Sequence, residues 1–180
     1  ENLPETKVKL QYDDQNLFVI FRVKDFYVRA VETQMHGDVW KDSCVEFFFA
    51  PCSENPNSYF NLEMNCCGVL LAQHHTGPRQ NNRFLEIEDC QRIRIASTAS
   101  GPVSKEIHKP LTWVLEYAVP FEILKHYANI EKPAPGVSWS GNFYKCADGC
   151  SMPHWMVWAP IFQDQPNFHR PDCFGVLNFI

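Results

Sequence analysis

The stretch HGDVWKDSCVEFFFAP, His36 to Pro51, places an aromatic ring and a carboxylate beside a strongly apolar segment. Trp40 precedes Glu46 by six residues, and three phenylalanines follow Glu46. In a β-strand, alternation puts Glu46 on the face opposite its two apolar neighbours. A carboxylate so close to a core strand needs a donor partner, because an unpaired buried charge is costly. The residues alone favour an internal ion pair, with Lys145 or Arg170, over a ligand hydroxyl.

The segment Tyr59–Asn65 carries a second set of polar groups. Alternation sends its apolar side chains to one face and Asn61, Glu63 and Asn65 to the other. Amide and carboxylate groups in a row can exchange hydrogen bonds with hydroxyl groups. A solvated outer surface is the competing interpretation, but this face lacks the Lys and Thr that are typical of such surfaces.

Composition restricts the class of protein. The chain has 180 residues, 45% apolar and 21% charged, which is typical of one soluble globular domain over residues 1–180. The net charge is -5 and no basic run is present, so we expect no nucleic acid partner. No apolar run approaches the roughly 20 residues that span a bilayer, so we expect no membrane insertion. The chain begins with Glu, and we expect some N-terminal sequence to be missing.

Eight cysteines are typical of an oxidising compartment. Cys44 and Cys146 fall within predicted strands and could form a cross-strand disulfide or two buried thiols, with thiols slightly favoured. A metal set can be drawn in the C-terminal third, but its spacing matches no zinc motif. Its members would be Cys146, Asp148, Cys150, His154 and His169.

Short β-rich segments separated by Gly, Pro, Asn and Asp predict an all-β fold. The expected strands include residues 8–12, 17–23, 44–49, 59–65, 69–74, 93–97, 112–119, 141–146 and 175–180. Pro120–Tyr127 is the one predicted helix, since proline favours the first helical position. This pattern predicts an antiparallel two-sheet β-sandwich of jelly-roll or immunoglobulin type.

Five blocks in order resemble carbohydrate-binding module family 9, in its family 9-like bacterial branch. These blocks are VWKDSCVEFFFAP, YFNLEMNCCGVLL, NFYKCADG, HWMVWAPI and PNFHRPDCFGVLNF, and the resemblance runs from Val8 to Phe179. It implies a β-sandwich related to the DOMON sugar- and haem-binding domains. It also implies non-catalytic binding of a mono- or oligosaccharide in polysaccharide degradation, in a periplasmic, extracellular or cell-surface location.

The resemblance also implies where a sugar would bind. Family members hold a sugar end between two tryptophans, and Trp40 and Glu46 match the first tryptophan and its following glutamate. Asn61 stands where an arginine is familiar, and Lys145 stands where an amide is familiar. Phe168 or His169 takes the place of the second tryptophan. The expected carbohydrate-binding residues are Trp40, Glu46, Asn61, Glu63, Lys145, Phe168 and His169.

Other functions stay open at this point. A DOMON-type haem domain would need axial ligands from Met35, Met64, His154 and His169. Glu46 and Glu63 could serve glycoside hydrolysis as a carboxylate pair. Because the second tryptophan is replaced, the pocket could also have degenerated, leaving a structural sandwich.

We expect no cofactor. A structural calcium ion is the one addition that the resemblance allows, with oxygen ligands from Asp13, Asp14 and Asp38.

Overall fold

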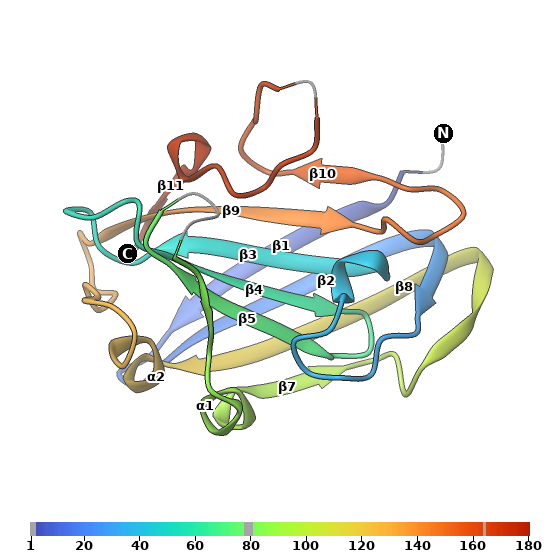
Figure 1. The fold of residues 1–180 in the computed structure, drawn as a ribbon, viewed down its shortest axis with the longest axis horizontal. Coiled ribbons are helices and arrows are strands. Elements are labelled where there is room, and N and C mark those ends of the chain that lie inside the picture. Colours follow the sequence, from blue (N-terminus) through green and yellow to red (C-terminus); the bar gives the residue numbers. More distant parts are fainter. Residues whose placement is uncertain (1–2, 78–80, 164) are drawn as a thin grey trace.

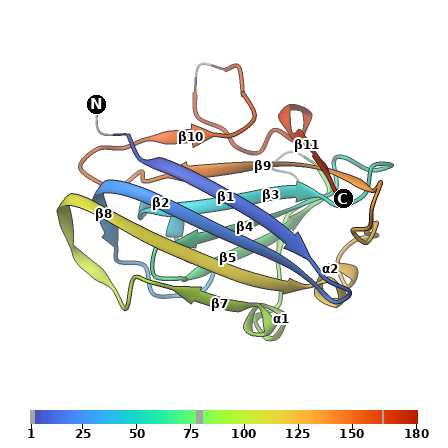
Figure 2. The same ribbon diagram turned by 180° about the vertical axis from the view of Figure 1, so that it is seen from behind.

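A computed structural model describes residues 3–77, 81–163 and 165–180, and it forms two antiparallel sheets that face each other. Figure 1 looks onto the seven-stranded sheet, and Figure 2 looks onto the four-stranded sheet from behind. The four-stranded sheet has the order β1 (Glu5–Tyr12), β2 (Asn16–Ala30), β8 (Val103–Pro120) and β7 (Arg94–Ser97). The other has the order β10 (Trp155–Val157), β9 (Ser138–Cys146), β3 (Cys44–Ala50), β4 (Tyr59–Asn65), β5 (Leu70–His75) and β6 (Arg83–Phe84), with β11 (Gly175–Asn178) also paired to β9.

The predicted sandwich is confirmed, while several elements differ from the prediction. Strands β2 and β8 are much longer than expected, and β6 and β10 were not predicted. The predicted helix is present as α2 (Phe121–Lys125), and a second short helix, α1 (Ile87–Arg92), accompanies it. Single turns of 3-10 helix lie at η1 (Val39–Lys41) and η2 (Pro171–Cys173). The missed strands have only two or three residues, too few to show a period of two.

The core lies between the sheets and follows the predicted alternation. Val45, Phe47 and Phe49 of β3 face inward, as do Phe60, Leu62 and Met64 of β4. Phe47 stacks on Phe143 at 4.5 Å between ring centroids. Because the apolar side chains all take this side, the polar residues of β3 and β4 are left on the outer face of the seven-stranded sheet.

Strands β2 and β8 pair over almost their whole length and carry two irregularities in register. One lies between Asp25 and Tyr27, where the Asp25 carboxylate accepts the backbone N–H of Phe26 at 2.8 Å. A bulge bends a strand and redirects its side chains. Asp25 is therefore turned into the interior, where its side chain is almost fully buried.

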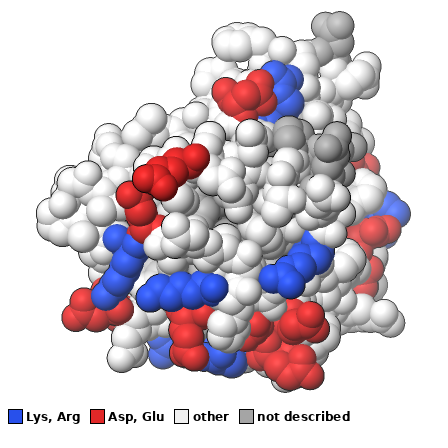
Figure 3. Space-filling view, turned by 60° about the vertical axis from the view of Figure 1, so that its left-hand side comes forward, with Lys and Arg blue, Asp and Glu red and all other residues white. Residues whose placement is uncertain are grey.

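The two α-helices in the described part of the chain are short, with six residues in α1 and five in α2. No helix there is long and apolar enough to cross a bilayer. On the flank in Figure 3, acidic and basic side chains lie interspersed. That flank offers no continuous basic surface to a phosphate backbone.

Candidate functional site

A pocket of about 430 Å³ lies on the outer face of the seven-stranded sheet, a size ordinary for small-molecule sites. We call it the Trp40 pocket. It combines aromatic rings with carboxyl and amide groups. Its lining comprises Trp40, Glu46, Phe48, Glu63, Leu71, Gln73, Cys146, Asp148, Trp155, Pro166, Asn167, Phe168 and His169.

Two carboxyl groups form part of the floor. Glu46 of β3 and Glu63 of β4 are directly opposite in register and both are buried. The amide of Asn61 donates to Glu63 Oε1 at 2.7 Å, and the thiol of Cys146 donates to Glu46 Oε1 at 3.0 Å. The donor to Glu46 is thus a neutral thiol, and the ion pair favoured by the sequence is wrong.

Burial controls the protonation of these groups. It raises the pKa of Glu63 to about 7, although the hydrogen bond from Asn61 acts in the opposite direction. It raises the pKa of Glu46 well above the ordinary value, with further contributions from Cys146 and Glu63. Burial also raises the pKa of Asp148, although the hydrogen bond from Trp155 and the nearby charge of Lys41 act in the opposite direction. Near neutral pH the floor can therefore both donate and accept hydrogen bonds.

Trp40 reaches the pocket from η1, on a loop held at both ends. The buried carboxylate of Asp42 accepts the backbone N–H of Val31 and of Glu32, at 3.0 and 2.9 Å. On the other side, the backbone N–H of Gly149 donates to Lys41 O at 2.7 Å. A Cβ at Gly149 would lie 2.7 Å from that same oxygen, so only glycine permits this approach. The indole is thereby fixed at the pocket wall without being buried in the core.

A second tryptophan lines the pocket, and the sequence analysis missed it. Trp155 of β10 pairs in register with Cys146, which places it on the pocket face of the sheet. Its indole N–H donates to Asp148 Oδ1 at 2.9 Å, and 45% of the residue stays exposed. The position of Trp155 in the pocket follows from the pairing of β10 with β9 and not from its own sequence neighbourhood. The sequence HWMVW contains two tryptophans, and nothing local shows which one faces the pocket.

Phe168 and His169 both lie in the pocket lining, as predicted, on the loop that precedes η2. The ring of Phe168 stacks on Tyr144 at 4.1 Å between centroids, and the Tyr144 hydroxyl donates to Phe168 O at 3.0 Å. His169 Nδ1 lies 2.9 Å from the Tyr59 hydroxyl. These contacts attach an irregular loop to the sheet and keep its aromatic rings over the floor.

Asn61 lies beside the pocket without lining it. Its amide donates to Glu63 Oε1 at 2.7 Å and to Gln73 Oε1 at 3.3 Å, and its carbonyl oxygen lies 2.8 Å from His75 Nε2. Asn61 therefore orients Glu63 and Gln73, which do line the pocket. Gln73 was missed because it lies in β5, whose neighbouring residues are apolar or histidine and gave no polar alternation.

Lys145 does not reach the pocket, contrary to the expectation from the resemblance. Its register partner is the core residue Val45, so its side chain enters the sandwich interior and is 1% exposed. There the ammonium lies 3.4 Å from Asp25 Oδ2 and 2.8 Å from His154 Nε2. Arg170, the other proposed partner of Glu46, pairs with Asp172 at 2.6 Å instead.

Among the described residues, one group of side chains lies close enough together to hold a metal ion. Cys44, Glu46 and Cys146 have donor atoms within 4.8 Å of one another, all buried, a set that would suit a soft ion such as Zn²⁺. Both thiols are free. The predicted set from the C-terminal third is not brought together: Asp148 accepts from Trp155, and His154 contacts Lys145.

The residues proposed for calcium or haem do not fit those groups. Asp13 accepts the backbone N–H groups of its own turn, while Asp14 pairs with Lys132 and Asp38 with Lys41. For haem, Met64 packs in the core, whereas His169 lies on the outer face. Both ring nitrogens of His154 are within hydrogen-bond distance of other groups, Nε2 of Lys145 Nζ and Nδ1 of Met152 O.

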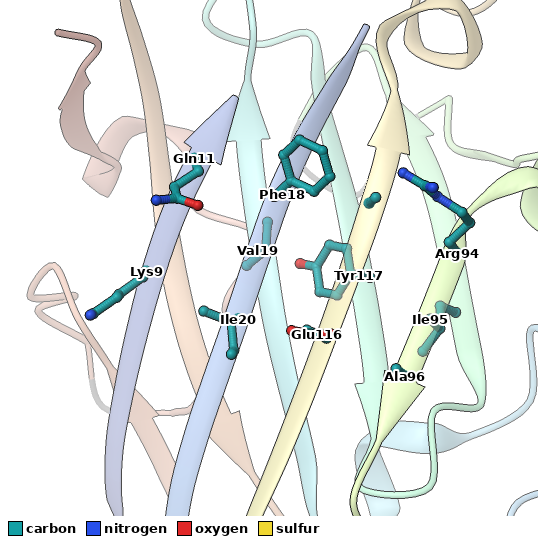
Figure 4. Close-up of a pocket in the computed structure, with 11 residues that line it drawn as sticks. Lys9, Gln11, Phe18, Val19, Ile20, Arg94, Ile95, Ala96, Glu116 and Tyr117 are labelled. Atoms are coloured by element: carbon teal, nitrogen blue, oxygen red, sulfur yellow. The ribbon is translucent and has the colours of Figure 1, made fainter. Parts of the chain in front are cut away.

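A second hollow, of about 580 Å³, lies on the outer face of the four-stranded sheet (Figure 4). Its polar side chains come from three strands, with Lys9 on β1, Glu116 on β8 and Arg94 on β7, and all three are exposed. Phe18 and Ile20 of β2 lie between them. Of these two hollows, the Trp40 pocket is the one whose described lining residues combine buried carboxyl groups with several aromatic rings, and it is the candidate site.

Comparison with solved structures finds one similar structure at 31% sequence identity and two at 13%. A candidate carbohydrate-binding protein from Bacteroides uniformis ATCC 8492 is 31% identical with a TM-score of 0.89, over 98% of this chain and 79% of that one. A family 9 carbohydrate-binding module from Caldicellulosiruptor kristjanssonii, solved with glucose, is 13% identical with a TM-score of 0.61, over 100% and 78% of the two chains. The same module solved with cellotriose gives the same identity and TM-score, over 99% and 76%. At 13% identity, these two structures show a shared fold only.

No curated protein matches the chain. The sequence model of carbohydrate-binding family 9 matches residues 1–179. This match covers nearly the whole chain, including every strand that builds the Trp40 pocket. The chain therefore belongs to carbohydrate-binding family 9, and it is a carbohydrate-binding domain rather than an enzyme.

Proposed function

We propose that the Trp40 pocket binds one sugar unit, either a free monosaccharide or the end of a glycan. The observation that carries this proposal is the combination of Trp40, Trp155 and Phe168 with buried carboxyl groups in one pocket. A pyranose ring has apolar C–H faces and a hydroxyl rim. Aromatic rings cover the faces by dispersion and burial, while the carboxyl and amide groups of the floor bind the rim.

The neighbouring structures suggest which sugars to test first. The Caldicellulosiruptor module was solved with glucose and with cellotriose, so a gluco-configured sugar is the starting point. We propose a role in polysaccharide degradation outside the cytoplasm, in the periplasm, in the medium or at the cell surface. Eight cysteines are compatible with such a compartment.

Isothermal titration with glucose, galactose, mannose, cellobiose and cellotriose tests the proposal. We expect one bound sugar per domain. In NMR spectra recorded along the same titration, we expect chemical-shift changes confined to Trp40, Trp155 and the strands beneath them. A correctly folded protein that gave no heat with any of these sugars, or shift changes only in the second hollow, would contradict it.

A further inference from the structure

The charge balance of the Trp40 pocket is one-sided. Three carboxyl groups line it, from Glu46, Glu63 and Asp148, and none of the lining residues in the described part of the chain is Lys or Arg. Protein sites usually balance a buried carboxylate with a basic side chain, because an unpaired buried charge is strongly disfavoured. No Lys or Arg side chain among the described lining residues does so here, and burial instead raises the pKa of Glu46 and of Glu63.

The hydrogen bonds to the two floor carboxyl groups come from neutral donors. Glu63 accepts from the Asn61 amide and Glu46 accepts from the Cys146 thiol, each through its Oε1 atom. The Oε2 atoms accept no hydrogen bond from the described residues. Since both carboxyl groups line the pocket, these oxygens are available to a ligand.

The basic residues that neighbour lining residues along the chain, Lys41, Lys145 and Arg170, are paired with other carboxylates. Lys41 lies 2.6 Å from Asp38 and 5.0 Å from the centroid of the Trp40 ring. Lys145 lies on the opposite face of the sheet, paired with Asp25. A ligand that enters the pocket therefore meets acidic groups at the floor and no Lys or Arg among the described lining residues.

We propose that the pocket selects a sugar that carries a protonated amino group, such as glucosamine. This inference rests on the proposed function and specifies its ligand. The ring would pack on the tryptophans, and the ammonium would lie between the carboxyl groups of Glu46 and Glu63, which would release their protons to solvent as the cation binds. Charge-assisted hydrogen bonds of this kind are about twice as strong as neutral ones.

A bare metal ion is a weaker candidate for the missing charge. The pocket volume of about 430 Å³ far exceeds the space of one ion, and two exposed or half-exposed indoles would contribute nothing to its binding. An amino sugar uses the rings and the carboxylates together. The sugar and metal alternatives are separated by adding a chelator, which removes an ion and leaves an amine untouched.

The test is titration calorimetry at about pH 7 with three matched ligands: glucose, glucosamine and N-acetylglucosamine. They share a ring, and only glucosamine carries a positive charge. We expect glucosamine to bind about tenfold more tightly than glucose, the ratio that one net charged hydrogen bond supplies. N-acetylglucosamine should show no such gain. EDTA should leave the ratio unchanged, and high salt should reduce it.

Isosteric variants test whether Glu46 and Glu63, at the floor of the pocket, cause the preference for glucosamine. Glu63→Gln and Glu46→Gln should each lower the glucosamine-to-glucose ratio, and the double variant should bring it to about one. Glu116→Gln, an exposed carboxylate of the second hollow, is the matched control and should keep the wild-type ratio.

Equal binding of glucosamine and glucose would overturn the inference and leave the proposed function standing. So would a preference abolished by EDTA, or ethanolamine binding as tightly as glucosamine. If none of the sugars in either panel bound to the folded protein, both proposals would fail together.

Discussion

Glu46 and Glu63 lie directly opposite each other on adjacent antiparallel strands, and both carboxyl groups face the Trp40 pocket. Like charges at such positions are destabilising unless protonation or a partner relieves them. The register also sends Lys145 to the far side of the same sheet. One pairing scheme thus concentrates acid on the binding face and confines the neighbouring ammonium to the interior.

Replacing Trp40 by Ala should weaken sugar binding by about 5- to 150-fold, since burial of a large aromatic face contributes about 1–3 kcal/mol. Trp40 is only partly buried, so the free energy of unfolding should change little. Calorimetry with the best sugar of the panel measures the first effect, and urea denaturation measures the second.

Trp158→Ala is the matched control for that experiment. Trp158 is 52% exposed and lies outside the lining of the Trp40 pocket. The Trp158→Ala variant should keep wild-type affinity for the sugar, whereas Trp155→Ala should lose affinity as Trp40→Ala does. Equal losses in all three variants would point to a general effect on folding instead of a sugar contact.

Glu63→Gln should change how stability depends on pH. The folded protein holds the Glu63 proton more tightly than the unfolded chain, because burial raises its pKa from 4.5 to about 7. The stabilising contribution is complete below pH 4.5 and is lost as pH rises through 7. The variant should therefore gain stability relative to wild type over this interval, at up to about 1.4 kcal/mol per pH unit.

The difference between the two proteins is the quantity to measure, by urea denaturation at several pH values. Burial lowers the pKa of His74 and of His75 to about 4, so these groups stabilise the fold with the opposite pH dependence. Their contributions cancel in the difference. A difference that stayed constant from pH 4.5 to 7 would show that Glu63 titrates normally.

Lys145→Met should destabilise the fold by about 3–5 kcal/mol, because it leaves the buried Asp25 carboxylate without its cation. Adding Asp25→Asn should recover much of that loss, since both charges are then absent. The single variant, where folded, should bind sugar like the wild type. A folded Lys145→Met protein that had lost sugar affinity would instead support the contact implied by the family resemblance.

Alkylation of the native protein should distinguish its cysteines. Cys67 is partly exposed, and its hydrogen bond with Cys66 lowers its pKa, so it should react first with iodoacetamide. Cys44 is fully buried, and burial raises its pKa to about 12. Cys44 and Cys146 should react only after unfolding. Intact mass against time counts the reactive thiols, and early modification of either buried cysteine would contradict the structure.

The sequence by itself determined the sandwich and the two faces of its central strands. Alternation in Cys44–Phe49 and Tyr59–Asn65 was strong enough to assign Glu46 and Glu63 to one face, because a one-residue slip would expose the phenylalanines. Phe168 and His169 were found through the family resemblance, which locates residues by their order along the chain. These predictions depend on local periodicity or on matched blocks, and both are present in the sequence.

Tertiary structure decided the rest. Trp155 reaches the pocket because the three-residue strand β10 pairs with β9, which brings Trp155 opposite Cys146. Gln73 reaches it because β5 pairs with β4 in the same sheet. Lys145 turns inward because its neighbour in register is Val45 and because a bulge in β2 presents Asp25 to it. Each outcome depends on which strands pair and in which register. That choice is made by packing between whole strands, whose paired residues lie 9 to 120 positions apart here, and no local pattern encodes it.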